Sequence, residues 1–212
     1  MLTLGKTLAH AAQDKPDKGN GLGKAILLVA RPGLGDPFFK ESVVLMFPPS
    51  VKIEDDLIVG LIVNKPTHVT LGDVFPEEKA LKDRTDTTYF GGPVEPRVPG
   101  VVFRSSKADK PAVQLFEDVY VSFDLDDMKG RLKGQEKTPD LRLFVGRAQW
   151  APAQLQNEMN LGAWYGLPVD ASLVFNTNPQ YLWHKLYDRA EHAPVAELLN
   201  KPFEFAASPR LQ

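Results

Sequence analysis

Polar side chains that could do chemistry gather where apolar strands are predicted to end. Asp36 lies in the loop after one apolar run, Asn64 and Lys65 follow another directly, and His68 comes shortly after them. A carboxylate, an amide, an ammonium group and an imidazole could together activate water, as hydrolases do. The same residue types in loops also serve as binding contacts on a rigid scaffold. The sequence leaves both interpretations open, because it does not show whether these residues meet in space.

Signatures of better-known chemistry are missing from the chain. It has no G-x-S-x-G nucleophile elbow, and its four histidines lack the spacing of a metal motif. The absence of cysteine excludes disulfides, thiolate zinc sites and a cysteine nucleophile. The stretch 124–127 (DLDD) resembles a calcium loop, but its glycine comes one residue late at Gly130, so helix capping by Asp124 explains it better. We therefore expect no metal and no cofactor.

The composition is that of an ordinary soluble globular domain. The chain has 212 residues, of which 43% are hydrophobic and 25% are charged. A formal net charge of −2 provides no general attraction to nucleic acids or anionic membranes. No apolar run approaches the roughly 20 residues that a membrane-spanning helix needs. We expect no direct nucleic-acid binding and no membrane contact.

Apolar runs bounded by glycine, proline and aspartate predict the elements that must position the candidate residues. A glycine pair, Gly91 and Gly92, is expected to form the tight turn between two strands within 88–105, which makes it a further candidate binding element. Strands are predicted at 24–30, 42–47, 57–63, 88–105 (two strands), 113–123 (a strand or hairpin), 141–145 and 172–175. A helical turn is predicted at 71–75, and helices are predicted to begin after Asp124, at Pro152 and at Pro179, the second closing near 162–166.

Strands and helices in this order do not alternate strictly, which favours an α+β fold over a doubly wound sheet. No composition break divides residues 24–212, so they are predicted to form one domain. Residues 1–23 are polar and glycine-rich, and we expect a flexible tail there. The alternative is that Leu8 to Ala12 is the end of a secretion signal that starts upstream, in which case the protein would be exported.

Four stretches, in order, resemble the YqgE/AlgH family of bacterial proteins. They are LLVARPGLGDPFFKESVVLM, GLIVNKP, YFGGPV and LFVGRAQWAPAQLQNEMNLGAW, and the resemblance covers residues 24–190. This chain departs from the family in having Ala153 and Gln156 where G-Q-L-E is usual, although Gln154, Leu155 and the later Glu158 are kept. Its N-terminal extension is also longer than is typical.

The resemblance implies a fold and a location but no reaction. It implies a single domain with a strongly bent, partly barrel-like mixed β-sheet flanked by a few helices, and a cytoplasmic protein. Some members are labelled transcriptional regulators, and no established active site can be carried over. Gln154 and Glu158 join the candidate binding residues because they lie in a motif of the family.

We therefore hypothesise a non-enzymatic binding or regulatory protein that contacts a protein partner or a small ligand. The candidate contacts are Asp36, Asn64, Lys65, Gly91, Gly92, Gln154 and Glu158. The alternative is a hydrolase-type enzyme that uses Asp36, Asn64, Lys65 and His68. Convergence of these side chains in one pocket would favour the enzyme.

Overall fold

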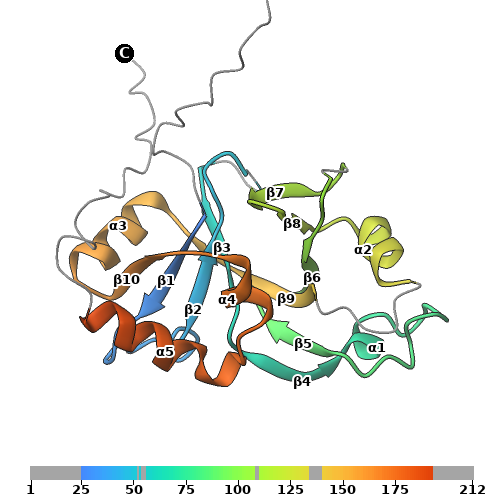
Figure 1. The fold of residues 1–212 in the computed structure, drawn as a ribbon, viewed down its shortest axis with the longest axis horizontal. Helices are drawn as coiled ribbons and strands as arrows, with labels where there is room; N and C mark the ends of the chain where they lie inside the picture. The colour runs from blue at the N-terminus through green and yellow to red at the C-terminus, as the bar shows by residue number, and fades with distance from the viewer. Residues whose placement is uncertain (1–24, 52, 54–55, 108–109, 134–139, 193–212) are drawn as a thin grey trace, which may run out of the picture.

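One strongly curled β-sheet forms the body of the protein, with helices around it (Figure 1). The computed structural model describes residues 25–51, 53, 56–107, 110–133 and 140–192. The prediction for residues 1–23 lies outside this range. The strands are β1 (Ile26–Ala30), β2 (Val43–Met46), β3 (Ile58–Ile62), β4 (Pro66–Thr70), β5 (Thr87–Phe90), β6 (Val94–Arg104), β7 (Val113–Phe116), β8 (Val119–Ser122), β9 (Leu141–Trp150) and β10 (Trp164–Pro168). The helices are α1 (Leu71–Val74), α2 (Leu125–Leu132), α3 (Pro152–Asn160), α4 (Ala171–Phe175) and α5 (Pro179–His192).

The strand order is β10-β1-β2-β3-β9-β6-β8-β7, with β5 beside β9 and β4 beside β5. The pairing of β5 with β9 is parallel and the other pairings are antiparallel, so the sheet is mixed. These features confirm the α+β class, the single domain and the bent sheet.

Strand β9 joins the two halves of the curled sheet. Its first half pairs with β6, where Leu143 lies opposite Val101. Its second half pairs with β3, where Ala148 lies opposite Gly60. Between the halves, Gly146 has a φ of +73°, a backbone conformation that favours glycine. Strand β6 pairs with β9 on both sides of Gly146, whereas β3 pairs with it only beyond that residue.

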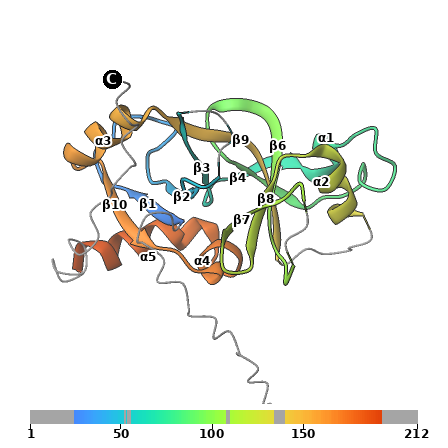
Figure 2. The same cartoon turned by 90° about the horizontal axis from the view of Figure 1, so that it is seen from above.

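Residues of β1 alternate between two apolar cores. Leu27 and Val29 pack in one core with residues of α5, whereas Leu28 and Ala30 pack in another with Leu155 of α3. Successive side chains of a strand point to opposite faces, so the two helices cover opposite faces of this part of the sheet. Both views show α3 and α5 on either side of β1 (Figures 1 and 2). This explains why the run Ala25 to Ala30 is apolar throughout rather than alternating.

Local signals at the helix ends are confirmed. Thr70 and Asp73 form a capping box on α1, and the carboxylate of Asp124 accepts a hydrogen bond from the backbone N–H of Asp127 at the start of α2. Pro152 is the first residue of α3, and the side chain of Asn178 accepts a hydrogen bond from the N–H of Gln180 in α5.

Two predictions near the C-terminal end are wrong. The stretch Ser172–Phe175 is not a strand but lies in helix α4, because Asp170 accepts hydrogen bonds from the N–H groups of Ser172 and Leu173 and so caps a helical turn. A short apolar run fits either element, and the cap decides it. Helix α3 ends at Asn160 rather than near 162–166, and the missed strand β10 follows it because its backbone pairs along the whole of β1.

A buried arginine, Arg142 of β9, connects three parts of the fold. Its side chain is buried, and the guanidinium group donates hydrogen bonds to the backbone oxygens of Val63 (3.4 Å), Phe175 (3.1 Å) and Thr177 (3.4 Å). Its Cζ atom also lies 4.7 Å from the centre of the Tyr89 ring. Burial lowers the pKa of Arg142, because no described carboxylate pairs with it.

We expect Arg142→Met to lower the free energy of unfolding by about 1–3 kcal/mol, because three carbonyl groups lose their donor. Urea denaturation followed by circular dichroism measures this change. The matched control is Arg97→Met at an exposed position of β6, where we expect a change within about 0.5 kcal/mol. An unchanged or raised stability in Arg142→Met would mean that the desolvation of the charge outweighs its hydrogen bonds.

Candidate functional site

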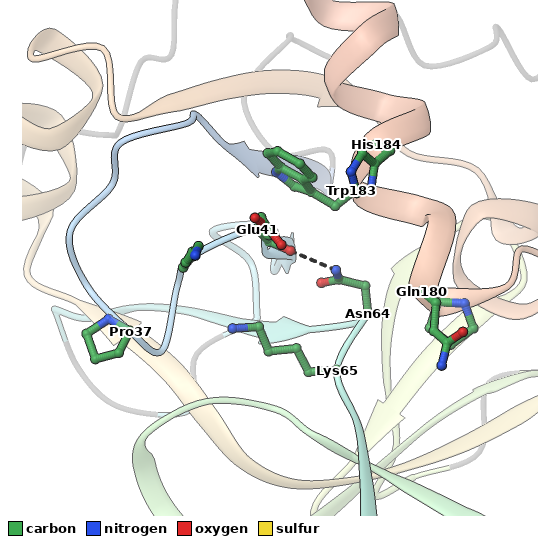
Figure 3. Close-up of a pocket in the computed structure, with 9 residues that line it drawn as sticks. Pro37, Glu41, Asn64, Lys65, Gln180, Trp183 and His184 are labelled. Carbon is green, nitrogen blue, oxygen red and sulfur yellow. Dashed lines mark hydrogen bonds between the residues drawn. The ribbon is translucent and has the colours of Figure 1, made fainter.

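A cleft opens between the loop after β1, the segment after β3 and the first turns of α5 (Figure 3). Its volume is about 460 Å³. We use "the cleft" for this site, which is lined by Pro37, Lys40, Glu41, Asn64, Lys65, Pro179, Gln180, Trp183 and His184. Two of the sequence-predicted candidates, Asn64 and Lys65, therefore lie together in one concave site.

Asn64 extends the pairing of β2 and β3 beyond the end of the backbone ladder. The N–H of Val63 still donates to the carbonyl oxygen of Val43 (2.9 Å). One residue further, the Oδ1 atom of Asn64 accepts a hydrogen bond from the N–H of Val43 (2.7 Å), and its Nδ2 atom donates to the carbonyl oxygen of Glu41 (2.9 Å). The core strand can end at this amide because the side chain replaces the lost backbone partners. The chain then turns, and Pro66 begins strand β4.

Lys65 lies half-buried in the cleft and is held by the opposite loop. Its Nζ atom donates a hydrogen bond to the carbonyl oxygen of Phe38 (2.7 Å). Burial lowers the pKa of Lys65, while the charges of Asp36 and Glu41 act in the opposite direction. A lysine with a lowered pKa in a concave site is a candidate functional group.

Asp36 shapes the loop that faces Lys65. Its carboxylate accepts a hydrogen bond from the N–H of Phe38 (2.7 Å), and its carbonyl oxygen accepts one from the N–H of Lys40 (2.9 Å). The resulting turn presents the Phe38 carbonyl to the ammonium group of Lys65. Asp36 does not line the cleft, although its neighbour Pro37 does.

The other sequence candidates lie elsewhere in the fold. His68 is exposed on β4 and does not line the cleft. Gly91 is part of the sheet: its N–H donates to the carbonyl oxygen of Val145 (2.8 Å), and its own carbonyl accepts from Ile62 (2.9 Å). Gly92 follows it with a φ of +149° at the same junction. The glycine pair thus joins strands, and whether it also binds a ligand stays a prediction.

Glu158 holds two tryptophan side chains against α3. Its Oε2 atom accepts hydrogen bonds from the indole N–H of Trp150 (3.1 Å) and of Trp164 (2.9 Å). Its Oε1 atom accepts one from the side chain of Gln154 (3.0 Å). The ring of Phe39 packs on both indoles, with ring centres 5.3 and 5.6 Å apart. Gln154 and Glu158 therefore have structural partners and do not line the cleft.

Sequence reasoning missed the wall of the cleft that α5 supplies. Trp183 of α5 is buried, and its indole N–H donates to the carbonyl oxygen of Ala30 (2.8 Å). His184, the next residue, lines the cleft with Pro179 and Gln180. The available signal was the helix start at Asn178-Pro179, but nothing in the sequence showed that this start faces residues far earlier in the chain.

A sequence model described as AlgH-like matches residues 27–194. This chain belongs to the AlgH-like family. A UPF0301 protein of Myxococcus xanthus is 32% identical over 160 residues, which cover 74% of this chain and 84% of that protein. The UPF0301 protein SCO2948 of Streptomyces coelicolor is 29% identical over 188 residues, which cover 83% and 92% of the two chains.

Two solved structures share the fold of this AlgH-like chain. The solution structure of the AlgH protein from Pseudomonas aeruginosa has a TM-score of 0.63 and 20% identity, covering 90% of this chain and 98% of that one. The crystal structure of a Corynebacterium diphtheriae protein has a TM-score of 0.62 and 24% identity, covering 85% and 92%. Among the described residues, no helix is both long and apolar enough to cross a membrane.

We expect Asn64→Ala to lower the free energy of unfolding by about 1–3 kcal/mol, because the N–H of Val43 and the carbonyl of Glu41 lose a buried partner. Chemical denaturation measures it, with the exposed helical position Asn157→Ala as the control that should not lose stability. If Asn64 were a catalytic group instead, the variant would keep its stability and lose a reaction. A variant unchanged in both respects would contradict both roles.

A second substitution tests the carboxylate between the two indoles. Glu158→Ala leaves both indole N–H groups without their acceptor, so we expect a loss of about 1–3 kcal/mol in thermal or urea unfolding. Glu158→Gln keeps an oxygen that can accept from both indoles, and we expect it to retain more stability than the alanine variant. Equal losses in the two variants would show that the negative charge, rather than an acceptor oxygen, stabilises this contact.

Proposed function

We propose that this AlgH-like protein is a non-enzymatic binding or regulatory protein that contacts a partner or small ligand at the cleft. The observation that supports the proposal is how the cleft side chains are used. Asn64 bonds to two backbone groups and Lys65 to a third, so both build a rigid concave surface. Among the described residues that line the cleft, no hydrogen bond joins one side chain to another, as a nucleophile and its general base would require.

The alternative, a hydrolase-type enzyme, has one observation in its favour. Lys65 is half-buried with a lowered pKa, which suits a general base or nucleophile. The proposed set is otherwise dispersed, since His68 lies outside the cleft and the carboxylate of Asp36 caps its own loop. His184 would have to replace His68 as the imidazole of such a site. We therefore rank binding above catalysis.

Any effect on transcription would pass through a partner rather than through direct DNA contact. Of the six basic residues in the two densest basic stretches, 79–84 and 129–134, four form ion pairs within the fold. Glu78 pairs with Lys129 (3.5 Å) and with Lys133 (3.0 Å). Arg131 pairs with Asp127 (2.8 Å), and Arg84 pairs with Asp86 (2.6 Å). Non-specific DNA binding needs clustered, available cations, and these ion pairs reduce their number. We propose that the protein is cytoplasmic, as the family resemblance implies.

We expect dissociation constants weaker than about 1 μM for labelled duplex and single-stranded DNA at physiological salt, measured by fluorescence anisotropy. Glu78→Gln removes the acidic partner of Lys129 and Lys133 and should strengthen any non-specific binding and its salt dependence. Tighter binding by the unaltered protein would contradict an indirect role.

A ligand screen tests the proposed function by comparing the unaltered protein with a variant whose cleft is blocked. The probe is a library of small metabolites, with binding detected by saturation-transfer NMR on the full chain. Gln180→Trp places a bulky ring at the cleft wall and should abolish binding of any hit, whereas Gln156→Trp, at an exposed position of α3, should not. Hits that both variants still bind would place the ligand elsewhere. Acyl-ester turnover that is lost in Lys65→Met would favour the enzyme.

A further inference from the structure

We propose that the cleft binds a small monocarboxylate, with its anionic group on the ammonium of Lys65 and its apolar part between Trp183 and the two proline rings. This inference rests on the proposed function, since it names the class of ligand for the same site. Figure 3 shows Lys65, Pro37 and Trp183 around one space, with Lys65 reaching across from the segment after β3.

The ammonium group of Lys65 has donors to spare. It carries three N–H bonds, and the Phe38 carbonyl oxygen is its one hydrogen-bond acceptor among the described residues. No described carboxylate forms an ion pair with it, although Asp36 and Glu41 lie close enough to influence its charge. A half-buried cation with unused N–H groups is the arrangement that a charge-assisted bond to a carboxylate completes.

The charge of Lys65 is only partly compensated within the protein. Burial is the largest influence on its pKa and lowers it, even though Asp36 and Glu41 both raise it. The neighbouring carboxylates are therefore too distant or too exposed to replace the lost hydration. An anion seated in the cleft would supply the missing compensation and would be held more firmly than at the open surface.

The other charges that face the cleft favour a monoanion over a dianion. Lys40 and Lys65 are opposed by Glu41 in the lining and by Asp36 beside it, so the surroundings are close to neutral overall. Bound phosphate typically has several N–H donors around it, and two nearby carboxylates would repel its second charge. His184 and the amide of Gln180 can donate further hydrogen bonds to a carboxylate.

The remaining wall of the cleft suits an apolar body. Trp183 is fixed by the bond from its indole N–H to Ala30 and stacks on Tyr187, with ring centres 5.3 Å apart. Pro37 and Pro179 add two rigid rings to the lining. A volume of about 460 Å³ accommodates an aromatic or branched acid. An aromatic monocarboxylate would therefore use both the ammonium group and the apolar wall.

The test compares benzoate with its uncharged isostere benzamide and with inorganic phosphate, by ¹H–¹⁵N NMR titration of the full chain. We expect benzoate to perturb the amides of the cleft and to bind at least about tenfold more tightly than benzamide or phosphate. The pKa of Lys65, followed through its side-chain resonances, should rise on saturation with benzoate, because a bound anion stabilises the charged amine.

Two variants assign the effect to Lys65. Lys65→Met should weaken benzoate binding by about tenfold, whereas Lys82→Met, the same charge change at an exposed position after α1, should leave it unaltered. Lys65→Gln keeps an N–H for the Phe38 carbonyl and serves if the methionine variant is unfolded. Loss of binding in that folded variant supports the same conclusion.

Several results would overturn the inference. Equal affinity for benzoate and benzamide would show that the cleft does not select an anionic ligand, although it would still be a binding site. Tighter binding of phosphate than of benzoate would contradict the preference for a monocarboxylate. An unchanged benzoate affinity in Lys65→Met would contradict the role of Lys65. If none of the three probes perturbs the amides of the cleft, the monocarboxylate inference is wrong. The proposed function would still stand if the metabolite screen gives an uncharged ligand that binds the cleft.

Discussion

The fold depends on a close approach of two backbones, at Gly91 and at Gly146. A Cβ atom on Gly91 would lie 2.2 Å from the carbonyl oxygen of Gly146, and one on Gly146 would lie 2.3 Å from that of Gly92. Only glycine fits on either side of this contact. Strand β9 passes through it, pairing with β6 on both sides of the contact and with β3 only after it. The junction therefore lies where β9 connects β3 with β6 in the curled sheet.

Polar side chains shape the cleft at the point where backbone pairing between the strands ends. The amide of Asn64 continues the pairing of β2 with β3, and Lys65 then reaches the opposite loop. Behind them, Arg142 binds the carbonyl of Val63 on one side and that of Thr177 on the other. Those two carbonyls lie just before the two walls of the cleft in the sequence. One buried cation thus links the segment that carries Lys65 to the segment that starts α5.

Local chemistry made much of this predictable, and distance along the chain made the rest unpredictable. Caps such as Thr70 and Asp124 act over three or four residues, so they can be read directly from the sequence. The role of Asn64 was also predictable in kind, since a strand that ends at an amide needs side-chain partners for its backbone. The meeting of Asn64 with His184 depends on how α5 packs on β1, which no short pattern encodes. The structural role of Glu158 was not predictable, because its indole partners come from two different strands.

The placement of the three tryptophans gives the protein two separate optical reporters. Trp150 and Trp164 share the carboxylate of Glu158, so their emission reports on the packing of α3. Trp183 lies in the cleft wall with its ring centre 4.9 Å from that of His184, and an imidazole at that distance can quench indole fluorescence. The pair therefore lies on one face of the sheet and the single ring on the other. A ligand in the cleft and a loosening of α3 would act on different tryptophans.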